Sequence, residues 1–108
     1  MTSRCSIGYE LSDMNLSKNS MLVKHIYNES MKDLTHETNT LHPLTMICDA
    51  ISQVHHIHAI TEIDEISTHA FVYLSFDDVS DIKHVKQVRK RFQSLAKGLL
   101  QADVRELS

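Results

Sequence analysis

An amphipathic stripe near the end of the chain is the feature that most constrains its fold. Between residues 82 and 102, apolar side chains follow helical spacing: Ile82, Val85, Val88, Phe92, Leu95, Leu99 and Ala102. This spacing predicts a helix of about six turns, one side of which must be covered by another layer. Ser80 and Asp81 precede the stripe, as a cap and as an acid at the positive end of the helix dipole.

Three segments alternate between apolar and polar residues, which is typical of half-buried strands: 5–11, 55–63 and 68–76. The middle segment is ambiguous, because Ile57, Ile60 and Ile63 recur every three residues and could extend a preceding helix. A strand over 68–76 needs a neighbouring strand, however. The sequence therefore favours a hairpin.

Two further helices are expected before this hairpin. One begins with Ser20 as its N-cap and runs to Leu34, and the other begins with Pro43 and runs to Val54. The element order is then β-α-α-β-β-α, an α+β fold with a small antiparallel sheet of about three strands and the helices packed on one face. The helix-strand-strand-helix order of residues 43–104 resembles the order found inside ferredoxin-like domains, a topological likeness that carries no motif.

Length and composition favour one intracellular domain over residues 1–108. The net charge of -3 and the pI near 6.2 disfavour nucleic acid and anionic membranes as partners. No secretory signal and no apolar run of ~20 residues is visible. Cys5 and Cys48 form no C-x-x-C pair, which favours a reduced, cytoplasmic protein with two buried thiols.

Alternate residues of the two expected hairpin strands lie on opposite sides of the sheet, and one side carries an unusual set of side chains. This face carries His56, His58, Ile60, Glu62, His69, Phe71 and Tyr73. Three helices are too few to cover both sides of the sheet, so we expect this face to stay open. Histidine, aromatic and aliphatic side chains mixed in this way are typical of surfaces that meet partners or ligands.

The open face predicts a small non-catalytic binding domain. We expect it to self-associate as a homodimer through this face and to bind a protein partner or a small molecule there. Imidazoles packed across a dimer axis would make association sensitive to pH between about 5 and 7.

A metal site is the first alternative. On a strand, His56 and His58 would have Cα atoms about 6.6 Å apart, and Glu62 or His69 could add a third ligand for zinc, nickel or copper. The candidate metal ligands are therefore His56, His58 and His69. A His-x-His pair alone is a weak signal, because ordinary surface histidines often show it.

A small enzyme is the second alternative, with His58 or His69 beside Tyr73 as a general base. The chain has two glycines and no G-x-S-x-G, which excludes a glycine-rich phosphate loop and a serine-hydrolase elbow. Cys48 lies among apolar residues and is expected in the core.

The basic residues of the last helix could bind nucleic-acid phosphates, since no acid interrupts Lys83, Lys86, Arg89, Lys90, Arg91 and Lys97. A charged run opposite an apolar stripe is more often a solvated helix face. We therefore expect no nucleic-acid partner.

Overall fold

Four strands and three helices occupy the part of the chain that the structure, a computed structural model, describes: residues 5–31, 41–64, 68–78 and 80–107. The elements are β1 (Cys5–Ser12), α1 (Ser20–Ser30), α2 (Pro43–His55), β2 (His58–Ile63), β3 (Ala70–Phe76), α3 (Ile82–Leu99) and β4 (Asp103–Glu106). The strands form one antiparallel sheet in the order β2-β3-β1-β4. The predicted α+β class is confirmed.

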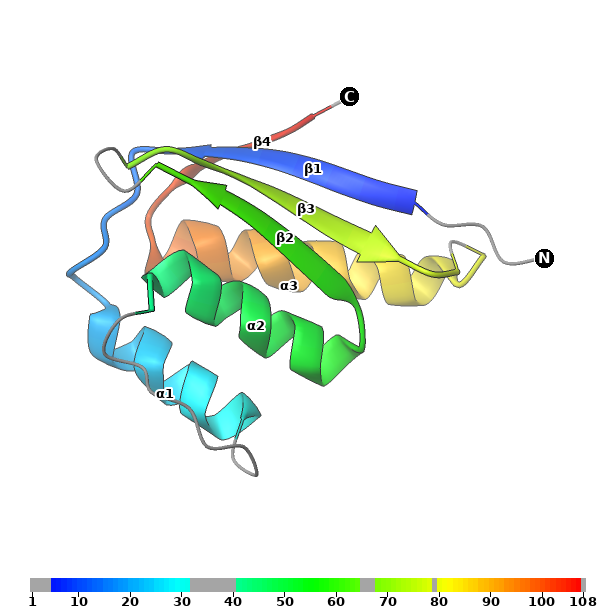
Figure 1. Cartoon of the computed structure of the whole chain (residues 1–108), viewed down its shortest axis with the longest axis horizontal. Helices are drawn as coiled ribbons and strands as arrows, with labels where there is room; N and C mark the ends of the chain where they lie inside the picture. The colour runs from blue at the N-terminus through cyan, green and yellow to red at the C-terminus, as the bar shows by residue number, and fades with distance from the viewer. Residues whose placement is uncertain (1–4, 32–40, 65–67, 79, 108) are drawn as a thin grey trace.

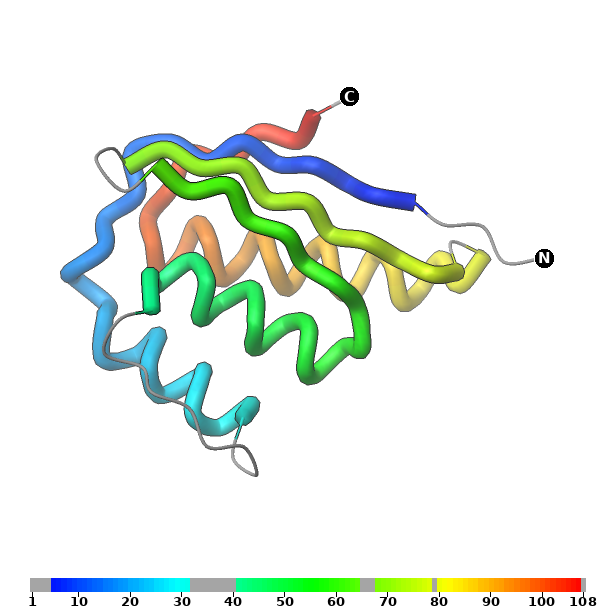
Figure 2. The backbone as a smooth tube through the Cα atoms, viewed as in Figure 1, coloured from blue at the N-terminus to red at the C-terminus, as the bar shows by residue number. Residues whose placement is uncertain are grey.

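The helices all lie on the same side of the sheet (Figure 1). Helix α2 contacts β2, α3 contacts β4, and the two helices contact each other, whereas α1 packs mainly on α2 and on α3. The backbone trace shows α2 and α3 running beneath the strands, with α1 farther from them (Figure 2). One-sided coverage by helices is therefore also confirmed.

The apolar core lies between the sheet and the helices. In β3, Ala70, Val72, Leu74 and Phe76 are buried, while the residues between them are only half-buried. The fully buried rings of Tyr9 and Phe92 join β1 to α3, with centroids 4.9 Å apart. The strand alternation in the sequence thus identified the inner face correctly.

The hairpin expected around residues 55–76 is confirmed. Strands β2 and β3 pair antiparallel from His58 opposite Ser75 to Ile63 opposite Ala70. The threefold repeat of isoleucines in this stretch does not continue the helix. Alternation is the correct reading because Ala59 and Ile63 pack against the core while Ile60 points away from it.

The fourth strand was not predicted, and the last helix is shorter than its stripe suggests. Helix α3 ends at Leu99, and Gln101 adopts a left-handed conformation with φ of 51° that turns the chain into β4. The helix has 18 residues, which is about five turns rather than six. Ala102 continues the apolar spacing because it is buried in this turn, not because it is helical.

The predicted helix starts are correct to within one residue. Asn19, not Ser20, is the N-cap of α1, and its side-chain amide donates a hydrogen bond to the carbonyl of Leu99 at 3.0 Å. Pro43 is the first residue of α2, as expected. Asp81 caps α3 by accepting a hydrogen bond from the backbone N–H of His84. Leu34, the expected end of the first helix, lies outside the described residues.

The order β1, α2, β2, β3, α3, β4 extends the resemblance to ferredoxin-like domains, with α1 as an additional helix between β1 and α2. Among the described helices, none combines the length and the apolar character that crossing a membrane requires.

The aromatic contact between sheet and helix gives a test of the fold. We expect Phe92→Ala to lower the free energy of unfolding by about 3–5 kcal/mol, because it leaves a cavity against Tyr9. Urea denaturation measures this change. Lys86→Ala, at an exposed position of the same helix, should change the free energy by less than about 0.5 kcal/mol. A loss below about 1 kcal/mol for Phe92→Ala would contradict this packing.

Candidate functional site: the uncovered sheet face

The side of the sheet that faces away from the helices is the candidate site, and we call it the open face. The structure places on it six of the seven residues selected from the sequence: His58, Ile60, Glu62, His69, Phe71 and Tyr73. It adds side chains from the other two strands, namely Ser6, Glu10 and Arg105, together with Leu107 just after β4. Arg105 and Leu107 were missed because β4 was not predicted, whereas Ser6 and Glu10 lie on a predicted strand whose neighbours the sequence did not reveal.

His56 does not belong to the strand, so its expected position beside His58 is wrong. Helix α2 continues to His55, and His56 is its C-cap in the left-handed conformation, with φ of 56°. His56 helps to line a hollow at the end of the sheet where β2 begins and β3 ends, with Asp81 and His84 among its neighbours. A strand pair of histidines therefore does not form.

The centre of the open face is an apolar row that crosses the sheet. Ile60 lies opposite Tyr73 on β3, and Tyr73 lies opposite Gly8 on β1. A Cβ atom at Gly8 would meet two ring carbons of Tyr73 at 3.1 Å and the side chain of Leu107 at 3.2 Å. The ring thus packs closely over the backbone of Gly8, and a larger residue there would require the ring to shift by a few tenths of an ångström. Ile60, at the end of the row, is 59% exposed.

A charged row lies beside the apolar one and joins β1 to β4 and to the residue that precedes β3. His69 donates a hydrogen bond from Nε2 to Oε2 of Glu10 at 2.7 Å, and Arg105 donates from Nε to Oε1 of the same carboxylate at 3.0 Å. The His69 ring also stands edge-on to Phe71, with centroids 5.0 Å apart. These contacts hold His69 and Phe71 in fixed positions on the open face.

The carboxylate of Glu10 is stabilised in its charged form by these partners. The hydrogen bond from His69, followed by that from Arg105, lowers the pKa of Glu10 below its usual value. Glu10 therefore remains ionised at neutral pH and acts as the negative centre of the row.

The third row of the open face is polar. His58 is exposed and lies opposite Ser75, which in turn lies opposite Ser6. The Oγ atoms of the two serines are 3.1 Å apart, within hydrogen-bonding distance. This row places the imidazole of His58 on one side of Ile60, whereas Glu62 lies on the other side.

The candidate metal ligands do not come together. Within residues 5–31, 41–64, 68–78 and 80–107, no three His, Cys, Asp or Glu side chains form a group suited to a metal ion. His56 lies at the helix end, His58 at the start of β2, and His69 on Glu10 before β3. The metal hypothesis thus has no ligand set among the described residues.

Two further groups have structural roles. Cys48 is a free, buried thiol, as the sequence predicted, and burial raises its pKa far above the usual range. Cys5, which was also expected to be buried, is a free thiol that is only half-buried. In the basic helix, Arg89 donates from Nη2 to Glu106 at 2.5 Å and from Nε to the hydroxyl of Tyr9 at 3.4 Å. Arg89 therefore fastens α3 to the sheet.

Comparison of the chain with protein-family models, with curated proteins and with solved structures finds no match.

The Glu10 network predicts a pH effect on stability. A carboxyl whose pKa is lowered on folding stabilises the fold above its unfolded pKa, and this contribution is lost as the pH falls through the lowered value. We therefore expect Glu10→Gln to lower the urea midpoint at pH 7, with the difference from the wild type shrinking towards pH 3. Glu29→Gln, at an exposed position of α1, serves as the control. A Glu10→Gln difference that is equal at both pH values would contradict the charged network.

Proposed function

We propose that the protein is a non-catalytic interaction domain that forms a homodimer through its open face. The observation that supports this most directly is Ile60, a large apolar side chain 59% exposed at the end of the Tyr73 row, on the side of the sheet that no described helix covers. Burying an apolar row against a second copy removes it from water and needs no further element from the chain.

The open face is self-complementary about a twofold axis along the apolar row. Such an axis places Ile60 against its own copy and brings His58 opposite Glu62 of the partner subunit. The reciprocal pair forms at the same time, because a twofold contact uses the same patch on both subunits. The dimer therefore contains two equivalent pairs of His58 and Glu62, one on each side of the apolar centre.

The open face is small for a protein–protein interface. Four strands about 4.8 Å apart and about 3.3 Å per residue along the seven residues of β3 give a flat area of roughly 450 Å². A stable interface of standard size buries about 800 Å² per partner. We therefore expect reversible, concentration-dependent association.

The first test is a matched pair of isoleucine substitutions. The wild-type mass should rise from 12.4 kDa towards twice that value as concentration increases, as measured by sedimentation. Ile60→Lys should keep the protein monomeric, because it buries a charge at the proposed axis. Ile82→Lys removes an isoleucine that is similarly exposed (62%) on α3 and should leave association unchanged. Equal association by all three proteins would refute the open-face dimer.

The second test is a charge exchange across the proposed axis. His58→Glu places an acid opposite Glu62 of the partner subunit and should raise the dissociation constant roughly threefold to tenfold. Adding Glu62→Lys to His58→Glu restores opposite charges at both pairs and should recover most of the affinity. If the double variant is weaker than His58→Glu alone, the twofold arrangement is wrong.

The proposal includes a reducing compartment such as the cytoplasm, since both described cysteines are free thiols. A protein partner or a small molecule on the open face is the other possible occupant. In that case, Tyr73→Glu would abolish binding of that occupant without changing the sedimentation mass of the protein.

A further inference from the structure

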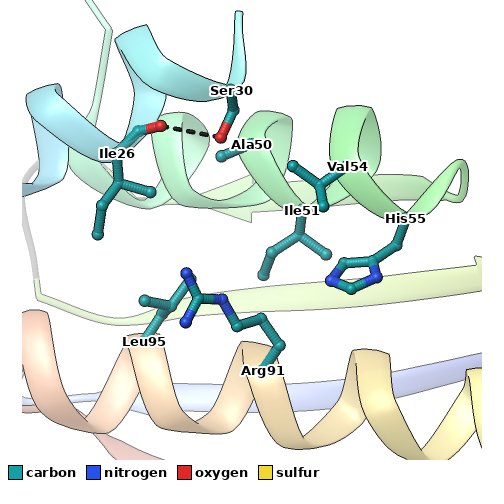
Figure 3. A pocket seen from close by; sticks show the side chains of 8 residues that line it. All are labelled: Ile26, Ser30, Ala50, Ile51, Val54, His55, Arg91 and Leu95. Carbon is teal, nitrogen blue, oxygen red and sulfur yellow. Dashed lines mark hydrogen bonds between the residues drawn. The ribbon is translucent and has the colours of Figure 1, made fainter.

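A groove on the helical side of the molecule lies outside the open face. It consists of two adjoining cavities that share Val54, His55 and Arg91. The inner cavity, of about 50 Å³, is lined by Ile26, Ser30, Ala50, Ile51, Val54, His55, Arg91 and Leu95 (Figure 3). The outer cavity is open to solvent and is lined by Val54, His55, Gln87, Lys90, Arg91 and Ser94.

The floor of this groove is aliphatic. Ile51 and Leu95 are buried side chains of α2 and α3, and Ile26 of α1 packs against the same core. Val54 stands at the junction of the two cavities and is 56% exposed. The inner part of the groove thus offers an apolar contact surface to a short hydrocarbon group.

The rim of the groove is cationic in the part of the chain that the structure describes. Arg91 and Lys90 are exposed on α3, and none of the described residues that line either cavity is Asp or Glu. Among the described residues, the ion pairs of arginine are those of Arg89 and Arg105. Figure 3 shows Arg91 reaching from α3 into the space between the helices.

The neutral polar groups of the groove differ in what they can donate. The hydroxyl of Ser30 already donates to the carbonyl of Ile26 at 2.8 Å, as drawn in Figure 3. Ser94 and Gln87 line the outer cavity, where they can donate to an anion beside Arg91. Donors therefore gather at the outer end, and hydrocarbon at the inner end.

We propose that this groove binds a small aliphatic carboxylate, with its chain against Ile51 and Leu95 and its carboxylate between Arg91 and Lys90. The planar guanidinium of an arginine matches a carboxylate with two parallel hydrogen bonds. Inorganic phosphate satisfies the cations but leaves the apolar floor empty. An uncharged alcohol fills the floor but leaves the cations unpaired.

His55 reports on occupancy of the groove. Burial, followed by the positive fields of His84 and Arg91 on α3 and of the adjacent His56, lowers the pKa of His55. His55 is therefore neutral at pH 7, and the positive charge of the site comes from Arg91 and Lys90. A bound carboxylate favours the protonated imidazole and should raise the pKa of His55.

The test is a titration of the full chain with butanoate at constant ionic strength, followed by amide chemical shifts in two-dimensional NMR spectra. We expect saturable shifts confined to residues 26–30, 50–55 and 87–95, with a millimolar dissociation constant for so small a ligand. Butanol, acetate and inorganic phosphate should each bind at least about tenfold more weakly. The imidazole titration of His55 should move to higher pH when butanoate is bound.

Two variants distinguish binding in the groove from a general effect of positive charge on α3. Arg91→Gln should weaken butanoate binding about tenfold or more, whereas Lys83→Gln, on the same helix but lining neither cavity, should change it less than twofold. Equal effects of the two variants would overturn the site.

Two further outcomes would also overturn the proposal. Butanol that binds as well as butanoate would show a purely apolar groove, and phosphate that binds more tightly than butanoate would show a plain anion site. Shifts in residues 87–95 that follow protein concentration, without butanoate, would show that a second copy occupies the groove. Ile60→Lys should bind butanoate like the wild type, so the groove can be judged separately from the open-face dimer.

Discussion

The packing of α2 and α3 against one face of the sheet is the constraint from which the other features follow. Phe92 meets Tyr9 in this layer, and β3 alternates strictly between buried and half-buried side chains. Since α1 packs on the other helices instead of crossing to the far side, the second face of the sheet receives no cover from a described helix. The same helix arrangement leaves the groove where α1, α2 and α3 meet. Both proposed surfaces are thus consequences of one layer arrangement.

Local patterns in the sequence predict most of this architecture, because period-two and helical spacing record directly which side of an element is buried. The predictions fail where the backbone conformation of a single residue determines where a helix ends. His56 and Gln101 adopt left-handed conformations without being glycine, so neither the end of α2 nor the turn after α3 carries its usual signal. Strand β4 has four residues, three of them charged and only Val104 apolar, and its sequence shows no strand pattern.

In the candidate site, too, local sequence patterns predicted some features and missed those that depend on tertiary packing. Six residues of the open face were identified because alternation along a strand determines which side chains share a face. Which strands are neighbours is not recorded in that pattern, so the contact of Glu10 with His69 and Arg105 could not be foreseen. The groove was missed for a related reason. Its lining comes from three helices whose relative placement depends on tertiary packing, and each of its residues taken alone resembles an ordinary surface or core position.

Charge is distributed unevenly over the molecule, and this reconciles a net charge of -3 with the proposal of an anion-binding groove. Glu10 and Glu62 lie on the open face, whereas four lysines (Lys83, Lys86, Lys90 and Lys97) and Arg91 are carried by α3 on the opposite side. A polyanion such as nucleic acid carries phosphates along a wide surface, so the acids of the chain would repel it as well. A small carboxylate meets only its immediate neighbours, because charges beyond about 10 Å are screened at physiological salt. Two cations above an aliphatic floor are therefore the basis for proposing a small amphipathic anion as the ligand.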